Sequence, residues 1–334
     1  MTFWGPIDLW TEEERRRCWP TPKSLTTKPK WIPFPSKVAF KSHEAEIMYP
    51  LFLCSNKSGL SDMDRLRLGS EGCDVITVRS CSEYEGEHLE LFSKFYRKPV
   101  IPVGLLPPVM DNSDRENITT TNTSTIFRWL DEQQPKSVVF VSFGSEYKLT
   151  QEEVSELAYG LELSTVPFLW ALRKPSWLTA DDINEALPDG FMDRIKGRGF
   201  VTVGWAPQLE ILAHSSVGGS LFHCGMGSIV ETLRYGHVLI LMPLIFDQGL
   251  NARFLAEKGV GIEVERNEDG SFSRDEIARC LRTAMVLDEG EALRAKAREM
   301  GATFGDQVLH DHYVKRFAEY LRNTRKKLHG LSSS

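Results

Sequence analysis

Apolar and polar residues follow a regular order over the second half of the chain. Six short runs of apolar and β-branched residues have the length and composition of buried strands, at 138–142, 168–173, 200–203, 217–222, 238–242 and 261–265. Residues between and after them have the apolar spacing of helices, over 150–163, in a short stretch after Gln208, from Ile229 onward, and over 252–257, 273–285, 291–300 and 306–322. Strands alternating with helices predict an α/β fold with a parallel, doubly wound sheet covered on both faces.

Two helix ends carry recognisable signals. Thr150 is the expected N-cap of the 150–163 helix, and Glu153 completes a capping box with it. Gly259 is expected to cap the C-terminus of the helix before it.

The first 106 residues show little regular periodicity. We expect a helix over 38–49 that ends at Pro50, a helical turn over 62–69, a strand over 73–79, a helix over 87–96 and a strand over 100–105. These few β–α units predict a partial N-terminal domain over residues 1–106.

Residues 107–136 differ in composition from the segments on either side. The stretch 107–123 is rich in Pro, Asn, Ser and Thr and has almost no apolar run, which is typical of an interdomain linker. We therefore expect a linker over 107–136, a second domain over 137–304, and a C-terminal helix and tail over 305–334.

Composition narrows the classes of function. The 334 residues suffice for about two domains, and 41% hydrophobic residues is ordinary for a globular protein. A net charge of -6 and a pI near 5.8 argue against a nucleic-acid partner. The charged runs 12–17 and 325–327 are interpreted as solvated faces. No apolar stretch reaches about 18 residues, so we expect no membrane span.

Cysteine usage and the absence of two motifs narrow the classes of function further. The six cysteines include no Cys-x-x-Cys pair, so neither a zinc site nor a disulfide framework is expected, and Cys224 is interpreted as a packing residue. We expect no metal, no secretory leader and a cytoplasmic location. Gly-x-Gly-x-x-Gly and Walker A sequences are both absent, which argues against nicotinamide and ATP chemistry.

The stretch 205–248 has the strongest indications of a binding site. Its strand 217–222 is followed by a turn with two glycines over 223–228 and then by a helix. Such a turn leaves free N–H groups at a helix N-terminus, which suits a phosphate, and His223 and Ser228 could donate to the same anion. Glu231, one turn later, could accept from ribose hydroxyls.

The two ends of this stretch suit a base and a ligand with several hydroxyls. Trp205 offers a flat face for a base. Asp247 and Gln248 follow the buried run 238–242, near the carboxyl end of a strand, where ligands bind in open α/β sheets. A carboxylate and an amide at that edge suit a ligand with several hydroxyls.

Each of these residues also has a purely structural explanation. Ser228 and Glu231 have the spacing of a capping box, which stabilises a helix and binds nothing. Gly225 and Gly227 could serve only to permit a tight turn. A single Trp such as Trp205 is more often a packing residue than a stacking platform. The ordered set as a whole is what favours a binding site.

The stretch resembles the nucleotide-sugar signature of plant-type family 1 glycosyltransferases, the UDP-dependent enzymes that glycosylate small molecules. Val141–Ser145, Phe168–Arg173 and Leu187–Phe191 are similar to further segments of that family, and the likeness runs from about Cys18 to the last helix. It is greatest to the branch that often adds a sugar to an existing glycoside. The resemblance implies a GT-B-like fold, in which two Rossmann-like domains face a cleft and the N-terminal one is here incomplete.

The resemblance also implies the partners and the site residues. The co-substrate would be a UDP-sugar without a further cofactor, and the acceptor a hydroxyl of a plant secondary metabolite or glycoside; we expect a monomer. By likeness, Trp205 stacks on uracil, the Ala206 backbone pairs with its edge, Gln208 and Glu231 contact ribose, His223, Ser228, Ser145 and the turn 225–227 contact the diphosphate, and Asp247 and Gln248 hold the sugar.

Two positions depart from the family pattern. The family usually has Trp where this chain has Met226, and Asn where it has Gly227, although the branch named above tolerates Gly. Met226 replaces a rigid aromatic wall with an adaptable side chain, and Gly227 removes an amide that would reach the phosphate or sugar. Weaker donor binding or an altered donor preference is expected, so glucose is not assumed to be the sugar.

The catalytic base is not assigned to any residue. The family uses a His in the first N-terminal β–α loop, supported by an Asp later in that domain, and neither segment has a counterpart here. His43 and His88 precede the predicted linker, but neither follows a strand in the required context. We therefore expect an inverting UDP-glycosyltransferase represented by an N-terminally truncated chain. The alternatives are a catalytically inactive UDP-sugar-binding protein and a non-functional truncated product that never folds.

Overall fold

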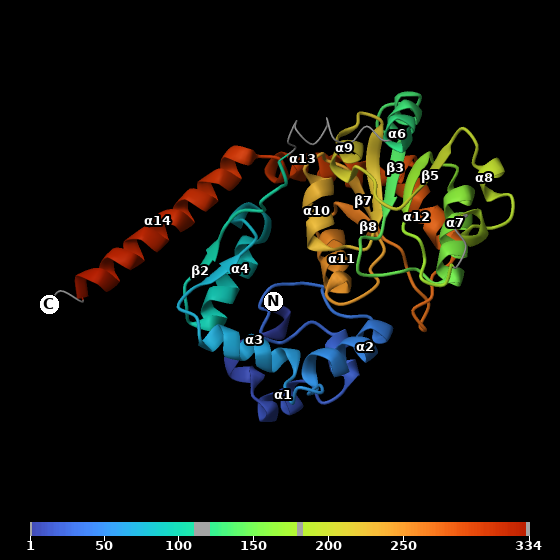
Figure 1. Cartoon of the computed structure of the whole chain (residues 1–334). Coiled ribbons are helices and arrows are strands. Elements are labelled where there is room, and N and C mark those ends of the chain that lie inside the picture. Colours follow the sequence, from blue (N-terminus) through green and yellow to red (C-terminus); the bar gives the residue numbers. More distant parts are fainter. Residues whose placement is uncertain (1, 110–120, 179–182, 332–334) are drawn as a thin grey trace. The chain divides into compact units, whose positions relative to one another are not determined.

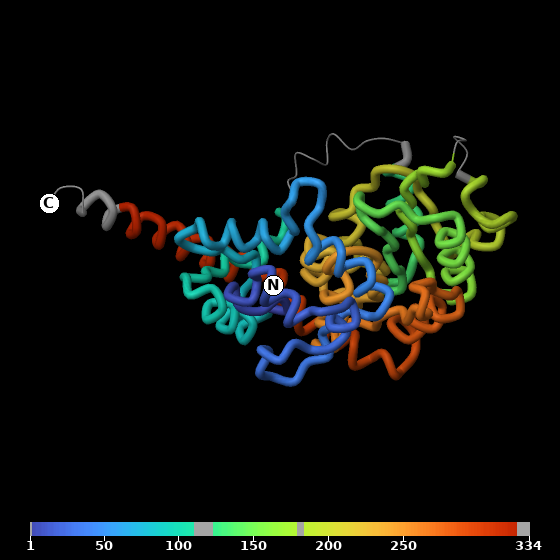
Figure 2. The backbone as a smooth tube through the Cα atoms, turned by 90° about the horizontal axis from the view of Figure 1, so that it is seen from below, coloured from blue at the N-terminus to red at the C-terminus, as the bar shows by residue number. Residues whose placement is uncertain are grey.

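The computed structural model describes residues 2–109, 121–178 and 183–331 (Figure 1). The chain divides into two compact units, and Figure 2 follows its backbone from one end to the other. Unit 1 comprises residues 1–107 and 303–334, and unit 2 comprises residues 108–302.

Unit 2 is built on a six-stranded parallel sheet with the strand order β5-β4-β3-β6-β7-β8. The strands are β3 (Val138–Ser142), β4 (Phe168–Leu172), β5 (Gly199–Val203), β6 (Val217–Phe222), β7 (Val238–Leu241) and β8 (Gly261–Glu263). The predicted parallel, doubly wound sheet is confirmed, and each strand begins and ends within two residues of the predicted bounds.

Helices connect these strands. They are α6 (Thr121–Asp131), α7 (Gln151–Ser164), η4 (Ile183–Ala186), α8 (Phe191–Arg194), α9 (Gln208–Ala213), α10 (Met226–Leu233), α11 (Gln248–Glu257), α12 (Arg274–Met285), η5 (Asp288–Gly290) and α13 (Glu291–Phe304). Both predicted helix signals are confirmed: Thr150 and Glu153 form a capping box at the start of α7, and Gly259 follows α11 in a left-handed conformation.

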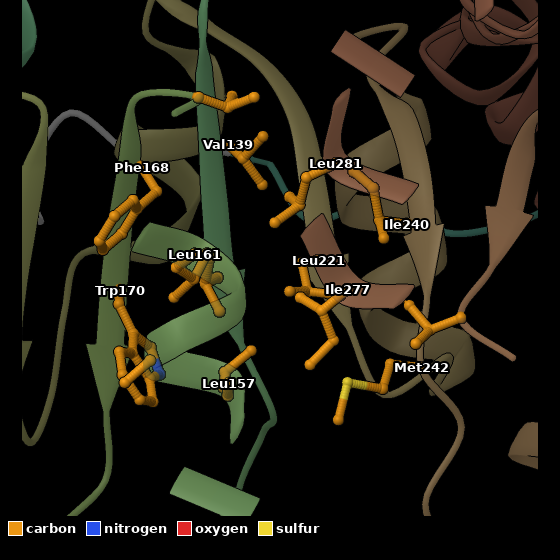
Figure 3. Packing of buried hydrophobic residues seen from close by; sticks show 14 of the residues in the cluster. Val139, Leu157, Leu161, Phe168, Trp170, Leu221, Ile240, Met242, Ile277 and Leu281 are labelled. Atoms are coloured by element: carbon orange, nitrogen blue, oxygen red, sulfur yellow. The ribbon is translucent and has the colours of Figure 1, made fainter. Parts of the chain in front are cut away.

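The alternation of side chains along β3 explains why both faces of the sheet are covered. Val139 and Val141 lie on one face, in a cluster with side chains of α7 and α12 (Figure 3). Val138 and Phe140 lie on the other face, with side chains of α6 and α9. Because successive residues of a strand point to opposite faces, a strand buried on both sides must be apolar throughout.

Helix α6 corrects the extent of the predicted linker. It lies inside the 107–136 stretch, and its Ile126 and Leu130 are buried in the core on the face of the sheet that carries Phe140. Two apolar residues four apart, at helical spacing, anchor a segment whose Thr and Ser content suggested a loop. Residues 110–120 of the predicted linker lie outside the described residues.

Unit 1 combines helices with a small parallel sheet. Its elements are η1 (Thr2–Trp4), η2 (Ile7–Trp10), α1 (Glu12–Cys18), η3 (Pro22–Thr26), α2 (Ser42–Leu53), α3 (Asp62–Glu71), β1 (Ile76–Val78), α4 (Ser82–Tyr96), β2 (Val100–Pro102) and α14 (Gln307–Leu331). Aromatic rings form much of its core, with Trp4 stacked on Phe52 at 4.1 Å and edge-on to Phe3 and Trp19.

Several predictions for unit 1 were wrong in detail: helix α4 begins at Ser82 rather than at residue 87, and strands β1 and β2 are shorter than predicted. The 38–49 helix begins instead at Ser42 and continues through Pro50 to Leu53. Lys41 N–H donates to Glu44 Oε2 at 2.8 Å, which fixes the later start, and proline removes one interior hydrogen bond without ending the helix. The charged run 12–17 is helix α1, and its Arg15 is buried against Ser61 and Asp64 rather than solvated.

The C-terminal helix α14 belongs to unit 1. Tyr313 Oη accepts from Ser82 N–H and donates to Glu83 Oε2, both at 2.9 Å. Leu105 N–H donates to His310 Nδ1 at 3.3 Å. These contacts join the helix predicted over 306–322 to α4 and to the residues after β2. Residues 332–334 of the predicted tail lie outside the described residues.

None of the helices in the described part of the chain has the length and apolar character needed to cross a bilayer.

Candidate functional site

The strand order of unit 2 creates one reversal point along the sheet. From β3 the chain proceeds to β4 and β5 on one side, and from β6 it proceeds to β7 and β8 on the other. Ser142 pairs with Phe222 at the carboxyl ends of β3 and β6, so the loops that follow these two strands emerge next to each other. A crevice outside the carboxyl ends of the strands at such a point is where open α/β sheets bind ligands.

His223 occupies this reversal point, packed between two glycines. A Cβ on Gly144 would lie 2.8 Å from His223 Cε1, and one on Gly225 would lie 2.6 Å from His223 Nε2. Gly144 also has a φ of 66°, and the residue after His223, the buried Cys224, is left-handed with a φ of 64°. Both loops are therefore shaped around the imidazole, and Cys224 is a packing residue, as predicted.

The surroundings of His223 favour its neutral form. Burial lowers the pKa of His223 below its ordinary value, and the carboxylates of Glu146 and Asp247 oppose that shift. The buried Nδ1 has no hydrogen-bond partner among the described residues. The backbone of Ser142 also forms a hydrogen bond with the ring, and this bond opposes the lowering of the His223 pKa.

Helix α10 begins beside His223, at Met226 rather than at Ile229. Gly225 is its N-cap and makes no side-chain cap bond, so Ser228 lies inside the first turn. The structural alternative of a capping box between Ser228 and Glu231 is therefore wrong. The N–H groups of residues 226–228 have no partner within the helix, because the first turn of any helix lacks acceptors. Ser145 lies exposed in the turn after β3.

Gln208 and Glu231 form a hydrogen-bonded pair on two neighbouring helices. Gln208 Nε2 donates to Glu231 Oε2 at 2.5 Å, and Gln208 Oε1 accepts from Ser142 Oγ at 3.5 Å. These contacts link the start of α9 and the second turn of α10 with the end of β3. It leaves the second carboxylate oxygen of Glu231 available to accept from a diol.

Trp205 follows β5 and is 72% exposed, so it is not a packing residue. Gly204, with a φ of 87°, turns the chain outward immediately before it. Ala206 is partly buried against the cluster that contains Phe140, which anchors the segment next to the exposed indole. The described chain thus presents a free aromatic face at the carboxyl end of β5.

Asp247 and Gln248 differ in what they can offer a ligand. Gln248 is buried, and its Oε1 accepts from Leu244 N–H and Ile245 N–H, both at 3.0 Å, so only its Nε2 is available. Asp247 is exposed, with a long contact of 3.4 Å from Asn251 Nδ2. Phe246, which precedes Asp247, has a left-handed backbone conformation and a half-exposed side chain. The sequence contains no signal that predicts this conformation.

A small hollow of about 20 Å³ lies between the ends of β3 and β4. It is lined by Phe143, Gly144, Tyr147, Lys148, Leu149, Trp170, Ala171, Leu172 and Arg173. Trp170 is fully buried, and its indole N–H has no acceptor among the described residues. The sequence prediction included none of these lining residues in the site. A second hollow, in unit 1, is lined by Arg15, Arg16, Glu12 and Tyr49 among others and contains no predicted site residue.

The order of the predicted residues along the sheet edge has a simple meaning. Trp205 follows β5, Ser145 follows β3, His223 follows β6 and Asp247 follows β7. Strands β5 and β7 are four steps apart, which corresponds to roughly 19 Å at about 4.8 Å per step. An aromatic face, an anion site and a carboxylate therefore follow one another in the order of base, diphosphate and sugar.

The described residues contain no group of three or more His, Cys, Asp or Glu side chains arranged to hold a metal ion.

Comparison with known proteins gives a consistent result. The model of the family described as UDP-glucoronosyl and UDP-glucosyl transferase matches residues 90–289. The chain is 43% identical over 324 residues to UDP-glycosyltransferase 91C1 of Arabidopsis thaliana, covering 97% of this chain and 67% of that protein. It is 42% identical over 304 residues to soyasaponin III rhamnosyltransferase of Glycine max, covering 90% of this chain and 63% of that protein.

Solved structures are similar as well. Apo UGT2 of Phytolacca americana superimposes with a TM-score of 0.69 at 32% identity, covering 81% of this chain and 60% of that one. UGT2 of the same organism with UDP-2fluoro-glucose and pterostilbene gives 0.64 at 32% identity, covering 77% and 55%. The α/β, GT-B-like fold class predicted from the sequence is confirmed. The chain spans between 55% and 67% of the length of these four relatives.

Proposed function

The chain belongs to the UDP-glucoronosyl and UDP-glucosyl transferase family, as its resemblance to plant-type family 1 enzymes predicted, and on that premise we propose that it binds the donor of an inverting UDP-glycosyltransferase. The acceptor is a hydroxyl of a small molecule, either a plant secondary metabolite or a glycoside. The observation that carries this proposal is the order of Trp205, His223 and Asp247 along one sheet edge.

The proposed donor contacts follow that order. Uracil stacks on Trp205 and pairs with the Ala206 backbone, and the ribose hydroxyls bind the Gln208–Glu231 pair. The exposed indole and the hydrogen bond of 2.5 Å between Gln208 and Glu231 support these two assignments. A carboxylate that already accepts one amide proton can accept from a diol with its other oxygen.

The diphosphate is proposed to lie against His223. Its other contacts are Ser145, Ser228 and the backbone N–H groups of residues 225–227. The position of His223 between Gly144 and Gly225 and the open first turn of α10 support this assignment. Hydrogen bonds and helix N–H groups held at this position would stabilise the negative charge that develops on the leaving diphosphate.

The sugar is proposed to bind at the far end of the edge. Asp247 accepts from sugar hydroxyls and Gln248 donates through Nε2, since Gln248 Oε1 is already engaged by the backbone. In the inverting reaction, an acceptor oxygen forms a bond to the anomeric carbon from the face opposite the diphosphate. The bond between that carbon and the diphosphate oxygen breaks, and UDP leaves with both electrons.

The acceptor proton needs a base, and we assign that role to none of the described residues. His88 is held in contacts of its own, because its Nδ1 lies 2.9 Å from Thr2 Oγ1 and its ring packs edge-on against Phe34. We propose as a second candidate function a protein that binds UDP-sugars without turnover. The two functions differ in whether UDP is released in the presence of a donor and an acceptor.

The identity of the sugar is left open in the proposal. Met226 and Gly227 both lie at the start of α10, and a Cβ on Gly227 would meet no atom within 4 Å. The site has unused room there, which supports a weakened or altered donor preference. The relative that is named a rhamnosyltransferase supports testing donors other than UDP-glucose.

We also propose a cytoplasmic monomer. The six cysteines, three of them buried, form no disulfide among the described residues, which supports a reducing compartment.

The first experiment is calorimetric titration of UDP into this chain, with Trp205→Ala as the variant and Trp177→Phe as a control in the same unit. Trp177 is partly buried, and its Nε1 donates to Leu149 O. We expect saturable binding that Trp205→Ala weakens by roughly tenfold or more and the control preserves. A folded chain that does not bind UDP would refute both candidate functions. Release of UDP from a donor and an acceptor would then separate the enzyme from the binding protein.

A further inference from the structure

Phe246 has an unusual backbone conformation for its residue type. Its φ is 55°, in the left-handed region that disfavours residues with a Cβ and especially bulky ones. Among the described residues with positive φ other than glycine, Phe246 is the aromatic one, and its side chain is half-exposed. Burial of the ring in the core therefore does not explain the left-handed backbone conformation of Phe246.

Gln248 holds the turn that presents this ring. Its buried side chain accepts from Leu244 N–H and Ile245 N–H at 3.0 Å, and its own N–H donates to Ile245 O at 3.2 Å. These three bonds close the turn on both sides of Phe246. A strained conformation that its surroundings fix in this way is most often found where a protein binds a ligand.

The neighbouring groups indicate which chemistry the ring would meet. Asp247 is exposed beside Phe246, and the only contact of its carboxylate with another side chain in the described chain is at 3.4 Å, from Asn251 Nδ2. Asn251 Nδ2 also donates to Cys224 O at 3.1 Å, which ties this turn to the loop that carries His223. A free carboxylate next to an aromatic face matches a pyranose, whose hydroxyls lie at its rim and whose C–H groups form an apolar face.

We infer that Phe246 is a stacking platform for a pyranose ring whose hydroxyls bind Asp247, and that it helps to decide which sugar is accepted. The inference rests on the proposed function, since it deepens the sugar end of the same site. Two sources of pyranose fit this chemistry: the sugar of the donor, and a sugar already carried by a glycoside acceptor. The ring would be a positioning and specificity residue that takes no part in proton transfer.

The test compares ligands with and without the pyranose. Calorimetry on the full chain would give dissociation constants for UDP and for UDP-glucose, UDP-galactose and UDP-rhamnose. With UDP present, dissociation constants would also be measured for 4-nitrophenyl β-glucoside and 4-nitrophenol. The variants are Phe246→Leu, which keeps an apolar side chain without the aromatic face, and Phe246→Tyr, which keeps the face. Leu163→Ala, which shortens an exposed apolar side chain at the end of α7, is the control.

The expected result is a loss of affinity that depends on the sugar. In Phe246→Leu, affinity for at least one UDP-sugar, or for the glucoside, falls by roughly three- to tenfold more than affinity for the matching ligand without a sugar. Phe246→Tyr and Leu163→Ala do not show this difference. Loss confined to UDP-sugars assigns the platform to the donor, and loss confined to the glucoside assigns it to the acceptor.

Two other results are distinguishable and both are negative. If the chain binds UDP but Phe246→Leu changes the affinities for ligands with and without a sugar equally, the stacking inference is overturned and the proposed function stands. If the folded chain binds no UDP, the proposed function fails and the inference fails with it. Phe246→Gly separates fold from contact, because it relieves the left-handed strain and should still lose the sugar-dependent affinity.

Discussion

Gln208 Nε2 lies 2.5 Å from Glu231 Oε2, which joins the first turn of α9 to the second turn of α10, two helices that follow different strands. The amide fixes one carboxylate oxygen and leaves the other free. If this pair binds ribose, its contribution must depend on the ribose hydroxyls. That dependence separates a binding role from a structural one.

We expect Glu231→Ala to weaken UDP binding by about 1.5–3 kcal/mol, the usual range for a hydrogen bond to a charged group. The same variant should have little effect on 2′,3′-dideoxy-UDP, which lacks the diol. Calorimetry with both nucleotides measures the difference. Glu210→Ala, on helix α9 beside Gln208, is the matched control. Equal losses for both nucleotides would mean that Glu231 acts on the fold rather than on the ribose.

The glycines of the site predict two opposite results. Gly144→Ala places a Cβ 2.8 Å from His223 Cε1 at a φ of 66°, so the imidazole must move and UDP binding should fall by about tenfold or more. Gly227→Asn enters open space, so it should be tolerated, and it supplies an amide toward the proposed diphosphate. Its affinity for UDP-sugars should rise by about 1 kcal/mol if the amide reaches the ligand.

Both variants can be judged by titration and by their thermal melts. Gly227→Ala is the control for Gly227→Asn, because it adds the Cβ without the amide. If Gly144→Ala bound UDP as well as the unchanged chain, the placement of the diphosphate against His223 would be wrong.

The comparison of sequence and structure shows which features a single sequence can carry. Strands β3 and β6 were predicted with their observed bounds, because a strand buried on both faces consists mainly of apolar and small residues. Helix α6 was missed, because Ile126 and Leu130 are few among many Thr and Ser residues. Pro50 was taken as a helix end, although neighbouring turns keep the helix intact through it.

The site divides in the same way. The chain order places Trp205, His223 and Asp247 after consecutive strands, so their common sheet edge could be predicted. The fit of the His223 ring between glycines and the left-handed turn at Phe246 depend on contacts between distant or unusual backbone segments. Local residue preferences carry no information on such contacts, which is why sequence reasoning missed them.

The pKa of His223 gives a pH dependence for donor binding. Burial holds this pKa below the usual value near 6.5, so the free protein has a neutral imidazole at pH 7 and above. A diphosphate favours the protonated ring and raises its pKa on binding. Affinity for a UDP-sugar should therefore increase as the pH falls from 8 and level off below the pKa of the free protein.

This dependence is measured by titrating a UDP-sugar between pH 5 and 8, because its diphosphate has no terminal phosphate that titrates near pH 6. His223→Asn should abolish the dependence. His214→Asn, which alters a histidine bonded to Ser216 and Asp131, should retain it. A pH profile that is the same in all three proteins would exclude His223 from the diphosphate site.

His237 gives a separate prediction, for stability in acid. It is fully buried at the start of β7, and its two ring nitrogens have no partner among the described residues. Burial, with a smaller contribution from Lys136, lowers the pKa of His237 to about 3. The unfolded chain, with an ordinary histidine pKa near 6.5, binds the proton first. Stability is therefore complete above pH 6.5 and falls as the pH drops toward 3.

At pH 4.5 this effect amounts to about 2–3 kcal/mol of the free energy of unfolding. Between pH 7 and 4.5, the free energy of unfolding measured in urea should therefore fall by about 2–3 kcal/mol less in His237→Leu than in the unchanged chain. His312→Leu, at an exposed position on α14, should lose as much as the unchanged chain. If His237→Leu lost as much stability in acid as the unchanged chain, groups other than His237 would be the cause of that loss.

The packing of α7 on α12 predicts opposite effects for one substitution at two helical glycines. A Cβ on Gly160 of α7 would lie 2.7 Å from both Cβ and Cγ2 of Ile277 on α12. Glycine is normally less stable in a helix than alanine by about 0.5–1 kcal/mol, but overpacking a core costs about 1–3 kcal/mol. Gly160→Ala should therefore destabilise unit 2.

Gly69 of α3 is the matched site, because a Cβ there meets no atom within 4 Å. Gly69→Ala should stabilise its helix by about 0.5–1 kcal/mol, since only the helix preference remains. Amide hydrogen exchange separates the two units, which a single melting curve does not. Protection should fall in α7 and α12 for Gly160→Ala and rise in α3 for Gly69→Ala. If Gly160→Ala raised protection instead, Ile277 would have room to move aside. The core between α7 and α12 would then accommodate an added methyl group.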